Sequence, residues 1–145
     1  QNARLGVESR GRVCVQGLVS LRDADENTGG LVLVPGSHRD HENLCNRSML
    51  ARRTGDFVPV SLDDPILQEG AVLVAANAGD LILWDSRTVA DDLSCEDCED
   101  WQLIREVGYV CMTPRSFAST DILKKRIEAF EQNIGTSHWP HKFVA

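Results

Sequence analysis

Short apolar runs, each bounded by a cluster of turn-forming residues, limit what this chain can fold into more than any other feature of its sequence. The first run, RVCVQGLVSL, has the alternating pattern of a strand, with these apolar residues on one face: Val13, Val15, Val19 and Leu21. The turn-rich stretch 23–30 then leads into a second short strand at 31–34. The two strands are expected to pair as an antiparallel hairpin.

Four more segments have the composition of short strands. They are 57–60, 71–75, 81–84 and 103–113. On the last of them, these side chains share one face: Arg105, Val107, Tyr109 and Cys111. Many short strands with turns between them favour a β-sandwich or barrel over a parallel α/β sheet.

Two helices are expected beside the strands. One covers 38–53, and Ser37 just before it can accept a hydrogen bond from its first amides. The other covers 119–134, begins at Ser119 and stops at Gly135. Its apolar residues recur at near-helical spacing, so we expect an amphipathic helix packed on the sheet.

The whole chain, residues 1–145, is expected to form one mainly β domain with helices at its periphery. Its 145 residues, 42% of them hydrophobic and 26% charged, have the composition of a soluble globular protein. A formal net charge of −7 argues against a nucleic-acid partner, because displacing phosphate counterions takes positive charge. No run approaches the roughly 20 apolar residues that span a bilayer, so no membrane insertion is expected.

Cysteine usage favours a reducing, intracellular compartment. The five cysteines are an odd number in a chain with an ordinary core, unlike a secreted disulfide framework. Cys95 and Cys98 form a single CxxC inside the acidic stretch 91–100, which has the composition of a solvated loop. Because a structural zinc site usually takes two such pairs, free thiols or an incidental disulfide are favoured over zinc.

Three stretches stand out and follow one another along the chain in this order: CVQGLVSLRDADENTGGLVLVPGSHRDH, AGDLILWDSRTVA and REVGYVCMTPRS. In order and spacing they resemble the phytanoyl-CoA dioxygenase family of iron(II)- and 2-oxoglutarate-dependent oxygenases. The resemblance implies a double-stranded β-helix, or jelly roll, which agrees with the strands expected above. The chain is then expected to be a partial domain, similar to the C-terminal part of that family's fold and lacking its leading strands.

The resemblance also implies an Fe(II) site of two histidines and one carboxylate, which leaves positions open for 2-oxoglutarate and O₂. In the family, an HxD motif supplies the first histidine and the carboxylate, and no HxD occurs in this chain. Gln1 and Asn2 resemble residues just after that motif, so the motif is expected in an upstream segment. The second histidine aligns with Ala90, which cannot bind iron. Asp91 is one residue out of register, which turns its carboxylate to the opposite face.

Two residues are candidates for binding the cosubstrate. Family members pair the far carboxylate of 2-oxoglutarate with an arginine after the second histidine, and Arg105 stands at that position. The alternative for Arg105 is a surface pairing with Glu106 or with a residue of the acidic stretch. Gln16 is expected to face the same cavity, with a solvated strand position as its alternative.

The four histidines are expected to be structural. His38 and His41 lie at the start of the first expected helix. In the family the histidine of PGSH is not a metal ligand, so a turn-stabilising or capping role is favoured for them. His138 and His141 flank Pro140, where a regular helix cannot form, and are expected to be packing or surface residues.

The sequence therefore predicts a phytanoyl-CoA dioxygenase-like domain that is not catalytic as it stands, with no catalytic residue, metal ligand or bound cofactor of its own. A structural or protein-interaction role follows, with another protein chain or its own N-terminal segment as partner, because missing leading strands would expose a sheet edge. The alternative is an Fe(II)- and 2-oxoglutarate-dependent dioxygenase of a small or lipid-like substrate, with HxD supplied upstream. A third possibility is a redox or metal-binding module at Cys95 and Cys98.

Overall fold

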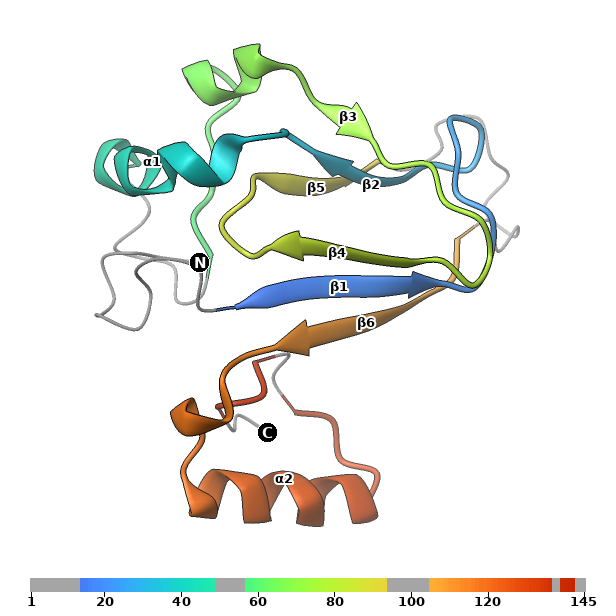
Figure 1. Ribbon diagram of the computed structural model, residues 1–145, viewed down its shortest axis with the longest axis vertical. Helices are drawn as coiled ribbons and strands as arrows, with labels where there is room; N and C mark the ends of the chain where they lie inside the picture. Colours follow the sequence, from blue (N-terminus) through green and yellow to red (C-terminus); the bar gives the residue numbers. More distant parts are fainter. Residues whose placement is uncertain (1–13, 49–56, 94–104, 137–138, 143–145) are drawn as a thin grey trace.

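The chain folds into two small antiparallel β-sheets with short helices around them (Figure 1). The structure is a computed structural model, and it describes residues 14–48, 57–93, 105–136 and 139–142. The first sheet has the strand order β4-β1-β6, with the bounds Leu81–Asp85, Val15–Ser20 and Val107–Met112. The second has the order β3-β2-β5, with the bounds Val72–Leu73, Gly30–Leu33 and Ala90–Leu93. The expected mainly β class is confirmed.

β1 lies at the centre of the first sheet and shows which face of that sheet is buried. Its even-numbered residues face the interior, and Leu18 and Ser20 are both 2% exposed. The odd-numbered apolar residues lie on the other face, and Leu21, just after the strand, is 52% exposed. The alternation therefore predicted the strand correctly, but the face richer in valine is turned outward.

β1 and β2 do not form the expected hairpin, because they belong to different sheets. A turn between them is held by Asp25, whose Oδ1 accepts hydrogen bonds from the amides of Asn27 and Thr28 at 2.8 and 3.1 Å. Just before this turn, Ala24 pairs with Ala76 in an isolated bridge. The chain thus passes from the first sheet to the second, and β1 pairs with β4 and β6 instead.

The second sheet contains a strand that the sequence did not predict. β5 includes Asp91 and Asp92, so the start of the acidic stretch is a strand rather than the expected loop. Charged side chains are tolerated here because β5 is an edge strand. Conversely, residues 57–60 were expected to be a strand and are not in one. Pro59 within that run has no backbone N–H to donate to a ladder.

Two short helical segments stand at the start of the helix expected over 38–53. They are the 3-10 helix η2, Ser37–Asp40, and the helix α1, His41–Arg47. Residues 49–53 lie outside the described part of the chain. Ser37 does not cap either helix as expected, because its buried hydroxyl accepts a hydrogen bond from the amide of Val89 at 2.8 Å. This bond ties the helical region to the connection between β4 and β5.

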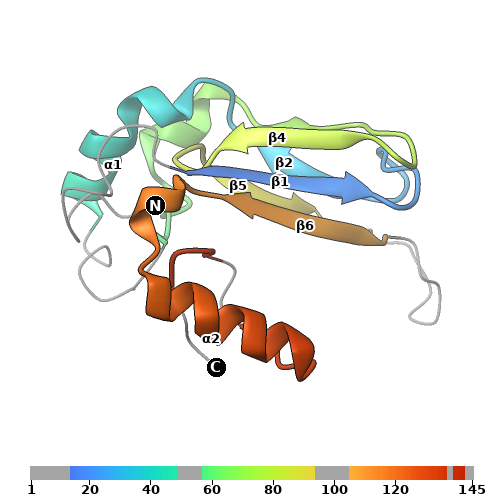
Figure 2. The ribbon, with the colours of Figure 1, turned by 60° about the horizontal axis from the view of Figure 1, so that its bottom comes forward.

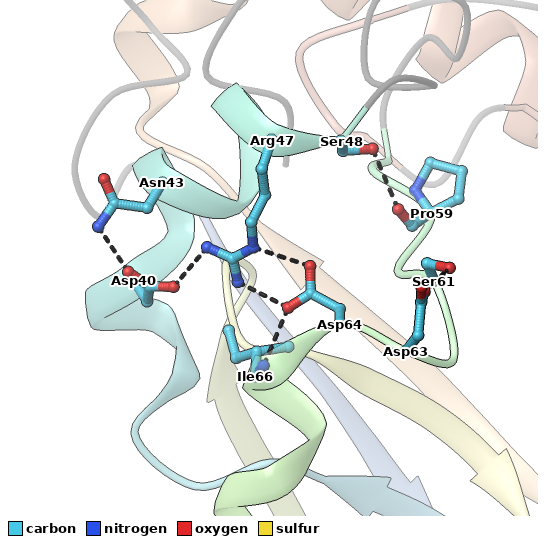
Figure 3. A network of polar contacts seen from close by, with 9 residues as sticks. All are labelled: Asp40, Asn43, Arg47, Ser48, Pro59, Ser61, Asp63, Asp64 and Ile66. Carbon is cyan, nitrogen blue, oxygen red and sulfur yellow. Dashed lines mark hydrogen bonds and ion pairs between the residues drawn. The ribbon is translucent and has the colours of Figure 1, made fainter.

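Arg47 at the end of α1 joins it to η3, the 3-10 helix Pro65–Glu69 (Figure 3). Its guanidinium donates two hydrogen bonds to Asp64, at 2.8 and 2.7 Å, and one to Asp40 at 2.7 Å. Asp64 also accepts the amide of Ile66 at 2.9 Å and so caps η3. The hydrogen bonds from Arg47 are the largest cause that holds the pKa of Asp64 below its ordinary value.

The second helix, α2, covers Thr120–Glu131 and begins as the sequence predicted, because Ser119 Oγ accepts the amide of Ile122 at 3.2 Å. Its expected apolar packing on the sheet is wrong. Ile127 is 59% and Phe130 83% exposed. Figure 2 shows, as Figure 1 does, that α2 lies beyond β6, the edge strand of the first sheet. None of the helices in the described ranges is both long and apolar enough to cross a membrane.

Candidate functional site

A cleft of about 670 Å³ opens beside β2 and β5. Its wall is mostly apolar and includes residues of β2, α1 and the segment 57–62. Its polar lining residues are Gln16, His41, Ser86, Arg87, Thr88 and Asp91. Small-molecule sites usually have this form, a concave and mainly apolar wall with a few polar groups. The cleft is therefore the candidate site among the residues that the structure describes.

Gln16 reaches this cleft from the central strand of the first sheet. It lies on the inner face of β1, directly opposite Trp84 of β4 and Cys111 of β6. The indole N–H of Trp84 is buried with no acceptor in the described part of the chain. Because an unpaired buried donor costs roughly 1–3 kcal/mol, this side of the sheet favours a group that accepts a hydrogen bond. Cosubstrate binding by Gln16 stays a prediction.

Arg105, the other predicted cosubstrate residue, contacts Asp92 of β5. Its Nη2 donates to Asp92 Oδ1 at 2.8 Å, and the Tyr109 hydroxyl donates to Asp92 Oδ2 at 3.4 Å. Burial alone would lower the pKa of Arg105, but the Asp92 carboxylate raises it above its ordinary value. These bonds join the two sheets. Arg105 is not one of the residues lining the cleft, so the structure does not bring it together with Gln16 there.

Ala90 stands at the start of β5, opposite Leu33 of β2. Asp92 is two residues further on, so it shares a face of the strand with Ala90. That face is the inner one in the sense that it is turned toward the first sheet, because Asp92 contacts Arg105 and Tyr109 there. Both Ala90 and Asp92 are nevertheless exposed. Asp91 is on the opposite face of β5, although both Ala90 and Asp91 reach the wall of the cleft.

The side chains described in the structure do not fit the iron site that the sequence resemblance implies. Ala90 presents a methyl group where an imidazole is required. Within the described ranges, no three His, Cys, Asp or Glu side chains are grouped so that they could hold a metal ion. Residues 1–13 and the CxxC of Cys95 and Cys98 fall outside those ranges.

His41 and Cys45 form a buried pair on α1 that the sequence analysis missed. The spacing in HENLC places them one helical turn apart, and His41 Nε2 lies 3.5 Å from Cys45 Sγ. His41 is 6% exposed. Burial, together with the nearby charge of Arg87, lowers its pKa to about 4, so the ring is neutral. The four-residue spacing was the available signal, whereas we had expected a turn-stabilising or capping role.

Arg87 brings a positive charge to the cleft, but Asp85 already binds it. Arg87 Nε and Nη2 donate to the two carboxylate oxygens of Asp85 at 2.9 and 2.7 Å. Burial alone would raise the pKa of Asp85, and the hydrogen bonds from Arg87 bring it below its ordinary value. An anion that enters the cleft must therefore compete with Asp85 for this guanidinium.

His38 and His141 are not among the residues that line the cleft. His38 is half-buried on η2. His141 packs edge-on against Phe117 of η4, the 3-10 helix Arg115–Phe117, with ring centroids 5.8 Å apart. This contact is the packing role expected for His141. His138 lies outside the residues that the structure describes.

Comparison with known proteins gives two matches. Residues 3–89 match the family described as phytanoyl-CoA dioxygenase (PhyH). A protein of Aspergillus versicolor named Ava biosynthesis cluster protein O is 30% identical over an alignment 152 residues long. The alignment covers 93% of this chain and 46% of that protein. The chain thus spans about half the length of this curated relative. No solved structure gives a significant match.

Proposed function

The chain belongs to the phytanoyl-CoA dioxygenase family, and from this premise we propose that it is a non-catalytic member with a structural or protein-interaction role. One observation carries the proposal. Ala90 lies on the inner face of β5, at the position that resembles the second histidine of the family's iron site. A methyl group has no lone pair to give to iron, and Asp91 beside it is on the other face of the strand.

The pairing of Arg105 supports the same proposal. In an active relative, this arginine would hold the far carboxylate of 2-oxoglutarate. Here the Asp92 carboxylate, 2.8 Å away, takes that hydrogen bond. The bond is charge-assisted, with the Asp92 side chain 49% exposed, and a cosubstrate would have to displace Asp92 from Arg105.

The order of the strands supports a jelly roll as the scaffold. From β1 to β6 the chain passes between the two sheets repeatedly, with β1, β4 and β6 in one and β2, β3 and β5 in the other. The outer face of the first sheet supports the interaction role. It carries exposed apolar side chains, which often mark contacts with another protein. They include Leu81, Leu83 and Met112, at 56%, 49% and 44% exposure.

The alternative function is an Fe(II)- and 2-oxoglutarate-dependent dioxygenase acting on a small or lipid-like substrate, with iron ligands from an upstream segment. The mostly apolar cleft with Gln16 in its wall favours this alternative. The name of the Aspergillus versicolor relative, which refers to a biosynthesis cluster, is compatible with it. Arg105 would then bind 2-oxoglutarate after leaving Asp92.

Iron content and turnover separate the two functions. We would express the longest protein that contains this sequence, measure bound iron by elemental analysis, and follow succinate production from 2-oxoglutarate. The proposal expects neither stoichiometric iron nor succinate in the unmodified protein. Both together would overturn it and establish the dioxygenase, in which Arg105→Gln should then weaken 2-oxoglutarate binding.

Two histidine variants at neighbouring positions make this experiment specific. Ala90→His restores an imidazole on the inner face of β5, whereas Asp91→His places one on the opposite face. If iron binds to Ala90→His but not to Asp91→His, the result would support a family iron site that lost its second histidine at position 90. Iron that binds equally to both variants would mean that position 90 is not the deficiency, and the argument from Ala90 would fail.

A further inference from the structure

Two thiols meet on the inner face of the first sheet. Cys14 directly precedes β1 and Cys111 is on β6, and their Sγ atoms are 3.6 Å apart. Gln16 lies directly opposite Cys111, and Cys14 is two residues before Gln16. The cysteines are therefore diagonal neighbours on one face of an antiparallel pair. Cys14 is 4% exposed, while Cys111 is only half-buried.

From this geometry we propose that Cys14 and Cys111 are a redox-sensitive pair that closes into a reversible disulfide when a peroxide reaches it. The Cys14 thiolate attacks one peroxide oxygen, the O–O bond breaks, and hydroxide leaves and takes up a proton as water. The sulfenic acid on Cys14 is then attacked by the Cys111 sulfur. The S–S bond forms as the sulfenic hydroxyl leaves with the Cys111 proton as a second water.

The contact between the two sulfurs favours Cys14 as the attacking group. A hydrogen bond from the Cys111 thiol is the largest cause that lowers the pKa of Cys14. A second contribution in the same direction comes from the hydroxyl of Ser86. The thiolate is the reactive form of cysteine, so a lower pKa makes Cys14 easier to oxidise. The half-buried Cys111 gives a small peroxide its approach from solvent.

The position of the pair favours a bond that opens again. Diagonal neighbours in a sheet have Cα atoms about 7–8 Å apart, just beyond the usual span of a disulfide. Closing the bond must therefore draw the start of β1 and the end of β6 together, and the resulting strain makes the disulfide easier to reduce. Both residues lie at strand ends, where the backbone has the most room to shift.

The disulfide would act on the candidate site because Cys14 supports two residues of the cleft wall. The Cys14 carbonyl accepts a hydrogen bond from the amide of Ser86 at 3.3 Å. Ser86 and Gln16 both line the cleft. A shift of Cys14 toward Cys111 thus moves the backbone that positions these two groups. The proposal stands whether or not the domain is catalytic.

The test is a thiol map of the full chain carrying Cys95→Ser and Cys98→Ser, which leaves three of the five cysteines. The protein is treated with graded hydrogen peroxide, blocked with a maleimide after unfolding, and digested for mass spectrometry. We expect two of the three thiols to be lost together, with a peptide linking Cys14 to Cys111. Dithiothreitol should restore both thiols.

Cys45→Ser is the matched control, because Cys45 is fully buried beside His41 on α1. Its cross-link between Cys14 and Cys111 should equal that of the parent, whereas Cys111→Ser should show none. Three reactive thiols after peroxide, or a cross-link that includes Cys45, would overturn the proposal. The measurement on the parent protein decides this even if a variant fails to fold.

Discussion

His41 links the protonation of one side chain to the stability of the fold. An unfolded chain binds a proton at histidine near pH 6.5. In the fold, burial lowers the pKa of His41 to about 4. Between these two values the unfolded state binds a proton that the folded state does not. The contribution of neutral His41 to the free energy of unfolding is therefore fully present above pH 6.5 and is lost as the pH falls toward 4.

Replacing His41 should remove this part of the pH dependence. Between pH 7 and pH 5, we expect the wild type to lose about 2 kcal/mol more unfolding free energy than His41→Gln does. Urea unfolding at the two pH values measures the difference. His38→Gln, at the half-buried neighbouring histidine, is the control and should keep the wild-type loss. An equal loss in His41→Gln and wild type would contradict the assignment.

Asp64 makes two contacts at once, so its removal should cost more than that of an ordinary surface carboxylate. Its carboxylate accepts two hydrogen bonds from the Arg47 guanidinium, and it caps η3 by accepting the amide of Ile66. We expect Asp64→Ala to lower the free energy of unfolding by about 1–2 kcal/mol. Asp63→Ala is the control, because Asp63 bonds only the exposed Ser61 hydroxyl among the contacts that the structure gives it. Equal effects in urea unfolding would mean that the Arg47 network contributes little.

At the scale of single residues, the sequence could indicate which residues are candidates for a role, but not which partner each side chain contacts in the fold. Gln16 was expected to face the same cavity as Arg105, and it lines the cleft whereas Arg105 does not. Ser37 was expected to cap a helix, yet its partner is Val89, far along the chain. Arg105 was considered both as a cosubstrate anchor and as a partner of the acidic stretch, and its contact with Asp92 depends on how β5 and β6 lie in the fold.

At the scale of elements, β1 and β4 pack so closely at position 17 that only glycine fits there. A Cβ added there would meet Leu83 Cδ2 at 2.5 Å and the Ile82 carbonyl oxygen at 2.8 Å. Because one of these atoms is backbone, the strands themselves must shift. We expect Gly17→Ala to lower the melting temperature, with a cost of about 1–3 kcal/mol.

Gly108 offers the matched comparison within the same sheet. It lies on β6 opposite Val19, and a Cβ added there meets nothing within 4 Å. Gly108→Ala should therefore leave the melting temperature unchanged or raise it slightly, because alanine loses less backbone freedom on folding. A larger loss in Gly108→Ala than in Gly17→Ala would contradict the packing described for β1 and β4.

Local patterns predicted most of the elements but not their partners. Strands at 31–34 and 81–84 were recognised from composition, and Ser119 predicted the start of α2. The absence of a β1–β2 hairpin could not be predicted, because the choice of sheet depends on contacts with distant strands. β5 was missed because its aspartates have low strand propensity, and an edge position tolerates them.

At the scale of the whole molecule, the two sheets should differ in how readily they open. β1 is paired along both edges, with β4 and β6, whereas β3 has two residues and is the edge of its sheet. Amide hydrogen exchange should therefore be about tenfold slower, or more, in peptides from β1 than in peptides from β3. Mass spectrometry of the exchanged protein measures this. Equal protection of both strands would show that the sheets open as a single unit.

The central place of β1 has a consequence for how the protein is made. During translation β1 is complete before either of its neighbours exists, because the residues of β4 come more than sixty positions later and those of β6 later still. Throughout that delay the nascent strand has two unsatisfied edges and alternating valines, which invite pairing with other chains. Chaperone protection during translation should therefore matter for the folding of this segment.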